Sequence, residues 1–424
     1  MLIGRQSEQK RSTSAAFSWT SASLIPRSPF MTALPRPDVV TLGCRLNLAE
    51  SETIRGLIGA RDMVVVNTCG VTNEAVKQSR AAIRRAHRVR PGAEIVATGC
   101  AAQIDPEGFA ALPGVSRIVG NAAKLLPVTW GGFPNHTPAS RHARAFVGVQ
   151  NGCDHACTFC AIPAGRGPSK SDPAGAVTAR IAALVEAGAR EVVLTGVDLT
   201  SYVDGEVTLG GLVERILAGV PALPRLRLSS LDTIEIDDRL FELVTSEPRV
   251  MPHLHLSLQA GDDLILKRMK RRHLRADATR MIERLKAKRD IAIGADLIAG
   301  FPTEDEAMFA NTLALIDDCE IVHTHVFPYS PRANTPAARM PQVAGEVARE
   351  RAARLRAASA RLRHAWLAGM IGTEQAIVLE KPGDRGHAPG FAELRFAGPR
   401  DDIGQILTTR VTGATDDHLI GTPI

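Results

Sequence analysis

The chain has 424 residues, of which 45% are hydrophobic, so it is long enough to bury the cores of two or three domains. Its 51 basic and 45 acidic residues give a formal net charge of +6, which is compatible with a nucleic-acid partner but does not identify one. Seven cysteines are too few for a disulfide scaffold, and no run of about eighteen apolar residues is present. We therefore expect a cytoplasmic protein with reduced cysteines and no membrane span.

The first thirty residues are rich in serine and arginine and contain one acidic residue, Glu8. This composition is typical of a transit peptide. It also fits an upstream start codon read in error, with Met31 as the true first residue, because the first strand pattern follows a few residues later. We favour the second interpretation, and in either case expect residues 1–36 to be a disordered or mis-assigned extension.

Residues 37–139 alternate short apolar runs with helix-like stretches, which predicts an N-terminal open parallel α/β sheet. A cysteine closely follows each of three runs: Cys44, Cys69 and Cys100. Their spacings of 25 and 31 residues match one βα unit each, and the carboxyl ends of parallel strands meet at one sheet edge. Free cysteines are often simply buried, but three at equivalent positions predict a three-cysteine metal cluster.

We predict a second α/β domain at residues 140–340. Six further apolar runs are separated by helical spacers, at 145–149, 191–196, 225–230, 253–258, 291–298 and 321–327. This pattern predicts a partial (βα)6 barrel with its site at the carboxyl ends of the strands.

A C-x3-C-x2-C triplet follows the first of these runs, formed by Cys153, Cys157 and Cys160. Three thiolates can bind one soft metal centre, but a closed tetrahedral zinc site needs a fourth ligand. The next cysteine, Cys319, is distant and alone, so zinc is disfavoured and a disulfide more so. A [4Fe-4S] cluster with one open iron fits the spacing better. We expect Cys319 to be a buried, inert thiol.

The last part of the chain is predicted to be a basic helical linker at 341–370 and a small all-β barrel at 371–424. The linker carries six arginines against two glutamates, which fits either a solvated face or an RNA-facing ridge. The barrel has five basic against eight acidic residues, a net charge of −3.

The triplet, with the aromatic Phe159 before its last cysteine, resembles the signature of radical S-adenosylmethionine (SAM) enzymes. The resemblance implies that SAM chelates the open iron and is cleaved to a 5′-deoxyadenosyl radical. It also implies cofactor contacts at Phe159 and at the strand ends: Thr195, Gly196 and Asp198 for the amino group, Ser257 and Gln259 for the ribose and carboxylate, and Asp296, Ile298 and Gly300 beside the adenine. Arg166 would bind the carboxylate as a charge-assisted donor. Each residue taken alone also fits an ordinary strand-end turn.

Two three-cysteine sites followed by a small β-barrel resemble the methylthiotransferase branch of radical SAM enzymes, from about residue 39 onward. The resemblance implies an N-terminal cluster domain, a radical SAM domain and a C-terminal TRAM-like barrel. It also implies two [4Fe-4S] clusters, SAM, an electron donor such as flavodoxin or ferredoxin, and a sulfur donor. The first cluster would deliver sulfur, and Cys153, Cys157 and Cys160 would generate the radical.

Three stretches, at 41–47, 253–273 and 325–332, are similar to those of enzymes that methylthiolate C2 of N-threonylcarbamoyladenosine at position 37 of tRNA, beside the anticodon. The isopentenyladenosine branch usually reads Gly-Cys-Gln-Met-Asn at the first stretch, and the ribosomal-protein branch reads Gly-Cys-Pro-Lys-Asn. Arg45 and Leu46 agree with neither. Those two substrates remain alternatives, and so does a non-catalytic iron-sulfur RNA-binding protein.

The surface that would bind tRNA is not evident from the C-terminal barrel, because an acidic barrel is a poor counterion for phosphate. We therefore expect more of the contact from basic stretches at 77–90, 267–272 and 349–363. Tyr329 and Arg332, after the sixth strand, are candidates to stack on or hydrogen-bond the target base.

Overall fold

The computed structural model describes residues 38–58, 61–131 and 143–424. The expected extension at 1–36 and the expected domain boundary at 139 lie outside these residues. None of the helices in the described ranges is long and apolar enough to cross a membrane.

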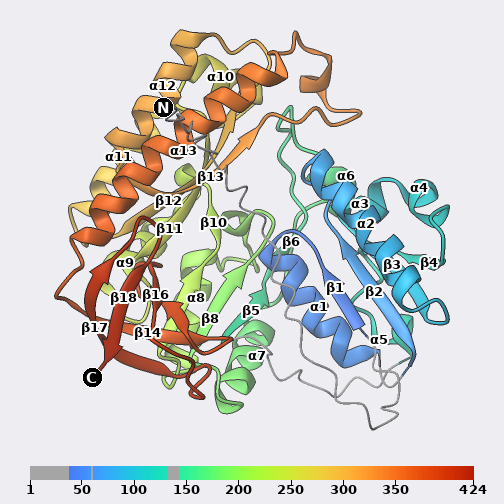
Figure 1. The fold of residues 1–424 in the computed structure, drawn as a ribbon, viewed down its shortest axis with the longest axis horizontal. Helices are drawn as coiled ribbons and strands as arrows, with labels where there is room; N and C mark the ends of the chain where they lie inside the picture. Colours follow the sequence, from blue (N-terminus) through green and yellow to red (C-terminus); the bar gives the residue numbers. More distant parts are fainter. Residues whose placement is uncertain (1–37, 59–60, 132–142) are drawn as a thin grey trace, which may run out of the picture. The chain divides into compact units, whose positions relative to one another are not determined.

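The N-terminal part contains a parallel sheet with strand order β1-β2-β3-β4 (Figure 1). Its strands are β1 (Asp38–Thr41), β2 (Met63–Thr68), β3 (Glu94–Gly99) and β4 (Val115–Val119). The helices are α1 (Arg45–Leu57), α2 (Asn73–Val89), α3 (Cys100–Ile104), α4 (Pro106–Ala110) and α5 (Pro127–Trp130).

Both faces of this sheet are covered, since successive side chains of a strand point to opposite faces. Val64 packs in a cluster with Ile83 of α2, whereas its neighbour Val65 packs in another with Ile54 of α1. Every residue of β2 is buried. The predicted open parallel sheet is confirmed, and β4 is a fourth strand that the sequence patterns did not identify.

The central part has two parallel sheets, one of order β5-β8-β9 and one of order β10-β11-β12-β13 (Figure 1). The strands are β5 (Arg144–Gly148), β8 (Glu191–Thr195), β9 (Arg225–Leu228), β10 (Ser230–Leu231), β11 (His253–Gln259), β12 (Ala292–Ala299) and β13 (Ile321–Pro328), and a short antiparallel pair is formed by β6 (Gln150–Asn151) and β7 (Lys170–Ser171). Between them run α6 (Ile162–Arg166), α7 (Ala174–Glu186), α8 (Leu209–Gly219), α9 (Asp238–Ser246), α10 (Asp263–Met269), α11 (Arg275–Lys286) and α12 (Glu306–Asp318).

A single residue, Ser229, separates β9 from β10, so these two are halves of the predicted third strand. The Ser229 amide donates to the Leu194 carbonyl of β8, and Leu226 of β9 bridges to Val250 just before β11. One continuous hydrophobic core joins the strands to the helices outside them. The six-stranded partial barrel is therefore confirmed.

Helix α13 (Gly345–Ala368) occupies the predicted linker, yet it packs firmly against the central part. Ala352 and Leu355 belong to the main core. Gly300, at the end of β12, has a φ of +70°, and a Cβ atom there would lie 2.4 Å from the Ala348 Cβ of α13. The helix approaches this closely because position 300 has no side chain.

The C-terminal part is a closed barrel of order β14-β15-β16-β18-β17, which confirms the predicted all-β barrel. Its strands are β14 (Glu374–Glu380), β15 (Arg385–His387), β16 (Glu393–Arg395), β17 (Ile406–Ala414) and β18 (Leu419–Pro423). Ile377, Leu394 and Val411 lie in its own small core.

One aromatic side chain joins this barrel to the central strands. The Phe391 ring stacks on His253, the first residue of β11, at 4.8 Å between centroids, and on His387 at 4.6 Å. Arg227 of β9 donates to the Pro389 carbonyl over 3.1 Å, and Arg144 of β5 pairs with Glu380 over 3.1 Å. The barrel is thus attached where the central strands begin.

Candidate active site

The cysteine triplet lies in a loop that neighbouring elements hold in place. Gly152 begins the turn with a φ of +78°, and a Cβ atom there would lie 1.9 Å from the Pro168 carbonyl oxygen, so glycine is required. The Thr158 amide and hydroxyl donate to the carbonyls of Met269 and Arg268, over 3.1 and 2.8 Å. The carbonyl of Thr158 accepts from Ala337 of the 3-10 turn Pro336–Arg339.

Each sulfur of the triplet faces an N–H donor. The His155 amide lies 3.4 Å from Cys153 Sγ, the Ile162 amide lies 3.4 Å from Cys160 Sγ, and Arg271 Nη1 lies 3.8 Å from Cys157 Sγ. All seven cysteines of the chain are free thiols. Burial raises the pKa of Cys153 to about 12 and that of Cys160 to about 11.

These observations fit an iron-sulfur site. Buried thiols with raised pKa values become thiolates when a metal replaces the proton. N–H groups directed at the sulfurs are the contacts that tune iron-sulfur clusters.

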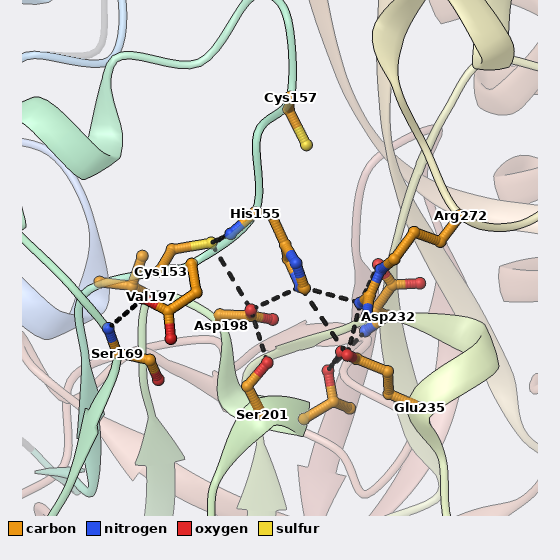
Figure 2. Close-up of polar contacts among 12 residues, drawn as sticks. Cys153, His155, Cys157, Ser169, Val197, Asp198, Ser201, Asp232, Glu235 and Arg272 are labelled. Carbon is orange, nitrogen blue, oxygen red and sulfur yellow. Dashed lines mark hydrogen bonds and ion pairs between the residues drawn. The ribbon is translucent and has the colours of Figure 1, made fainter.

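The loop after β8 lies beside Cys153, as Figure 2 shows. Asp198 Oδ2 is 3.6 Å from Cys153 Sγ and 2.8 Å from His155 Nε2, and it accepts from Ser201 Oγ over 2.6 Å. Gln150 Oε1 accepts from the amides of Val197 and Asp198 over 3.0 and 2.9 Å, which fixes the turn. Thr195, Gly196 and Asp198 therefore end a strand next to the triplet.

The ends of β11 and of the triplet loop are joined by Arg271. Its Nη2 donates to the Ser257 carbonyl over 2.8 Å and to Asp232 over 2.7 Å, while its Nη1 faces Cys157. The pairing of β11 with β12 shifts register between Leu256 and Gln259, and Gln259 has a φ of +67°. Arg271 was predicted only as part of a basic stretch, and no sequence signal set it apart from its neighbours.

The predicted residues of β12 divide between two environments. Asp296 Oδ1 lies 3.0 Å from His255 Nε2 and 3.1 Å from His325 Nδ1. Burial alone would raise the pKa of Asp296, but the two histidines hold it well below its usual range. Ile298 instead belongs to an apolar cluster that includes Phe159, whose ring meets Phe301 edge-on at 6.3 Å. Gly300, which has no side chain, allows α13 to pack closely after the end of β12.

The three N-terminal cysteines follow β1, β2 and β3, where parallel topology was expected to gather them. Cys44 is the N-cap of α1, and Cys100 begins α3. Gly43 has a φ of +90°, and a Cβ atom there would lie 2.6 Å from Cys69 Sγ, so the turn before Cys44 lies directly on Cys69. Burial, together with the charges of Cys44 and Cys100, raises the pKa of Cys69 to about 11.

Arg166 is placed differently from the prediction that it binds the SAM carboxylate. Its guanidinium donates to Glu50 over 2.7 and 3.2 Å, to Asn151 over 2.9 Å, to Asn47, and to Cys100 Sγ over 3.1 Å. These contacts occupy all five N–H groups, so none remains for a cofactor carboxylate. Arg166 instead binds helices α1 and α3 of the N-terminal part, where it contacts a cysteine of the other triplet.

A buried charge network supports this arrangement. Glu50 and Lys124 pair over 2.5 Å, and the side chains of Lys124, Glu50 and Arg166 are 0%, 3% and 1% exposed. Burial would raise the pKa of Glu50, but Lys124 and Arg166 lower it. Glu50 and Lys124 were not identified from the sequence, because nothing local indicates that a charge on an amphipathic helix will be buried.

The two cysteine triplets lie close together. A Cβ atom on Gly165 of α6 would lie 3.4 Å from the Cys100 Cβ, and Gly165 is five residues beyond Cys160. Cys100 also contributes to the raised pKa of Cys160. The loop of the second triplet therefore packs against the start of α3, which carries Cys100.

The three basic stretches differ in how many charges they leave available. Arg84, Arg85 and Arg88 of α2 are exposed and have no ion-pair partner among the described residues. In the other two stretches five arginines pair with carboxylates: Arg271 with Asp232, Arg272 with Glu235, Arg351 with Glu304, Arg354 with Glu306, and Arg361 with Asp317. Arg349 is exposed and has no ion pair among the described residues. The alternative of a solvated linker face therefore fits α13 better than an RNA-facing ridge.

The two candidate base contacts also have partners in the protein. Tyr329 meets the Phe301 ring edge-on at 5.5 Å. Arg332 Nη1 donates to Asn73 Oδ1 over 2.6 Å, so it fastens the segment after β13 to the start of α2. Cys319 is buried, as predicted, and burial raises its pKa to about 11.

Comparison with known proteins gives two family matches and many relatives. Residues 147–316 match the radical SAM superfamily, and residues 36–120 match a family described as uncharacterized protein family UPF0004. The threonylcarbamoyladenosine tRNA methylthiotransferase MtaB of Rickettsia prowazekii is 42% identical over 408 residues, covering 91% of this chain and 96% of that protein. A tRNA-2-methylthio-N(6)-dimethylallyladenosine synthase of Cereibacter sphaeroides is 34% identical, covering 90% of this chain and 97% of that protein.

Among solved structures, the fold is similar to that of the radical SAM methyltransferase TsrM from Kitasatospora setae. The TM-score is 0.50 with 16% sequence identity, and the match covers 65% of this chain and 64% of that one. This likeness supports the fold. Family membership follows from the sequence relatives, and the chain belongs to the radical SAM methylthiotransferase family.

Proposed function

We propose that this protein methylthiolates C2 of N-threonylcarbamoyladenosine at position 37 of tRNA. The observation that carries the proposal is the closeness of two three-cysteine sites, linked by Arg166 and α6, in a chain 42% identical to a protein named for this reaction. A transfer of a sulfur-containing group needs a radical source and a sulfur source at one carbon. Two neighbouring iron-sulfur sites supply both.

In this proposal Cys153, Cys157 and Cys160 hold the [4Fe-4S] cluster at which SAM binds, and Cys44, Cys69 and Cys100 hold a second one. When bound, the first cluster and SAM supply the one-electron chemistry that activates the target carbon. Thr195, Gly196, Asp198, Ser257, Gln259, Asp296 and Ile298 are proposed to line the SAM site, with Phe159 packing behind the loop and Gly300 keeping α13 close.

The remaining residues position these groups. Arg271 holds Cys157 and the end of β11 together, and Asp198 orients His155 beside Cys153. The proposed division is an N-terminal cluster domain at 37–139, a radical SAM domain at 140–340, and a TRAM-like barrel at 371–424.

The tRNA is proposed to bind along α2, where Arg84, Arg85 and Arg88 are available to phosphates. An electron donor such as flavodoxin or ferredoxin and a separate sulfur donor are part of the same proposal. So is a cytoplasmic location, where the cysteines stay reduced.

Nucleoside mass spectrometry of tRNA from strains with and without the gene tests the function. The 2-methylthio form of N-threonylcarbamoyladenosine should disappear on deletion and return with the wild-type gene. Loss of 2-methylthio-isopentenyladenosine instead would assign the protein to the substrate named for the Cereibacter sphaeroides relative. No change in either nucleoside would contradict a tRNA-modifying role.

Iron analysis tests the two sites separately. The reconstituted protein should hold about eight irons, as two cubane clusters contain. Cys157→Ala and Cys100→Ala should each hold about four, and only Cys157→Ala should lose 5′-deoxyadenosine formation. Cys319→Ala, which changes a cysteine outside both triplets, should keep all eight. Deoxyadenosine formation by Cys157→Ala would refute the assignment of the radical site.

A further inference from the structure

Arg45 is a half-buried arginine that forms no ion pair with any other residue the structure describes. Among the described residues its guanidinium makes no hydrogen bond and no ion pair. Its central carbon lies 5.4 Å from the centroid of the Phe391 ring. A cation over an aromatic face is stabilised only modestly, so the N–H groups of Arg45 remain available to an acceptor.

The other arginines at this ring have carboxylate partners. Arg144 and Arg227 lie 5.3 and 5.0 Å from the same centroid. Arg227 pairs with the buried Glu191 over 2.9 Å, and Arg144 pairs with Glu380 over 3.1 Å. Because Glu191 also pairs with Arg225 over 3.6 Å, the arginines here outnumber their carboxylates, and Arg45 is the one that has no ion pair among the described residues.

A second polar group lies within electrostatic range of Arg45. His255, Asp296 and His325 come from adjacent strands β11, β12 and β13, and the two imidazole rings are 4.5 Å apart. The Phe391 ring that Arg45 covers stacks on His253, and His255 lies on the same face of β11 two residues further on. The carboxylates of Glu191 and Asp296 both attract the charge of Arg45, but neither forms an ion pair with it. A polar wall of this kind suits a substituent that carries hydrogen-bonding groups and is unfavourable for an apolar one.

Arg45 also has a fixed position relative to the reaction. It directly follows Cys44, a ligand of the proposed sulfur-delivering cluster, and begins α1. A base whose target carbon lies at that cluster brings its own substituent within reach of the adjacent residue.

We propose that Arg45 is a specificity-determining residue that binds the carboxylate of the threonylcarbamoyl substituent, beside the wall of His255, Asp296 and His325. This inference rests on the proposed function. The carboxylate neutralises the surplus charge through charge-assisted hydrogen bonds. An isopentenyl substituent has no acceptor, and its binding would leave Arg45 desolvated and unpaired.

The test pairs a change in the protein with a change in the substrate. The reconstituted full chain is assayed anaerobically on anticodon stem-loop RNA that carries threonylcarbamoyladenosine, either as the free acid or as its primary amide. The amide keeps the size and hydroxyl group of the substituent and removes only the negative charge. The proteins are the wild type, Arg45→Gln, Arg45→Lys and the control Arg190→Gln, which makes the same change at an exposed position.

For the wild type and Arg190→Gln, kcat/KM should fall about 10- to 100-fold from acid to amide, as expected for a hydrogen bond to a charged group. With the acid RNA, kcat/KM of Arg45→Gln should already be about 10- to 100-fold below that of the wild type. With the amide RNA it should fall little further. Arg45→Lys should retain part of the preference, because it keeps the charge without the guanidinium fork.

Two results would overturn the inference while leaving the proposed function intact: equal turnover of acid and amide by the wild type, or an undiminished acid preference in Arg45→Gln. The first uses only unaltered protein, so it holds even if the variant folds poorly. Failure of the wild type on the acid RNA, together with turnover of isopentenyladenosine RNA, would refute the proposed function itself.

Discussion

Replacing Glu50 by Gln should destabilise the protein strongly, because two buried cations depend on this one carboxylate. Glu50 accepts hydrogen bonds from Arg166 over 2.7 and 3.2 Å and pairs with Lys124 over 2.5 Å. Glutamine keeps the shape of the side chain but leaves Lys124 and Arg166 uncompensated.

Breaking a buried ion pair by removing one partner costs about 3–5 kcal/mol. Since a domain is stable by only about 5–15 kcal/mol, this is a large fraction of the total. The difference in the free energy of unfolding between the wild type and Glu50→Gln should become smaller as the pH rises. Burial already lowers the pKa of Lys124, and loss of Glu50 lowers it further, so alkaline solution removes one of the stranded charges.

Denaturant unfolding followed by tryptophan fluorescence measures the effect. Trp130 is a local reporter, because it is buried and its indole N–H donates to the Lys124 carbonyl over 2.7 Å. Glu74→Gln is the matched control, since it makes the same change in an exposed pair with Lys77 and should cost about 0–1 kcal/mol. If Glu50→Gln loses no more stability than Glu74→Gln, the buried network does not support the fold as reasoned.

Three further predictions follow from contacts described above. Gly300→Ala should lower the free energy of unfolding by about 1–3 kcal/mol, because the added Cβ would overpack against Ala348. The control Gly175→Ala should not lower it, since no atom lies within 4 Å of a Cβ added there. Thermal unfolding compares the two variants, and equal melting temperatures would contradict the close approach of α13. Replacing Arg84, Arg85 and Arg88 by Gln should reduce the slope of log binding constant against log salt concentration for tRNA by about 2–3. Filter binding over a range of salt concentrations measures this slope. An unchanged slope would show that the tRNA phosphates bind elsewhere on the protein. His387 and Arg144 outweigh burial and lower the pKa of Glu380 to about 2, below its value of about 4.3 in the unfolded chain. The contribution of Glu380 to the free energy of unfolding is therefore present above about pH 4.3 and is lost as the pH falls toward 2. Urea unfolding between pH 5 and 3 should show a smaller loss of stability for Glu380→Gln than for the wild type, and equal losses would contradict this assignment.

The positions of the six cysteines in the two triplets could be predicted from the sequence because they depend on local patterns. Each strand is a run of apolar residues, each cysteine follows at or near its end, and parallel topology brings those ends to one edge. The spacing of Cys153, Cys157 and Cys160 is set by a single loop. The same reasoning missed β4, whose residues are mostly half-buried and lack a continuous apolar run.

The partners of individual charges could not be predicted, because they depend on how distant elements pack. Arg166 follows the triplet by six residues, which suggested a role at the SAM site, yet all but one of its acceptors come from α1 and α3. Arg351 lies in a strongly basic helix, yet it is buried against Glu304. A sequence shows that a charge exists, whereas only the fold shows which charges have already been neutralised.

Because Phe391 packs on the first residues of the central strands, the C-terminal barrel cannot be removed without affecting the central part. A C-terminal barrel joined by a free tether could be removed or exchanged like an accessory. Here, removal would expose the His253 ring face and strip Arg227 of its acceptors at Ala388 and Pro389. A chain shortened at residue 370 would therefore lose contacts that cover the first residues of the central strands, and its failure to act on tRNA would not by itself show that the barrel binds RNA.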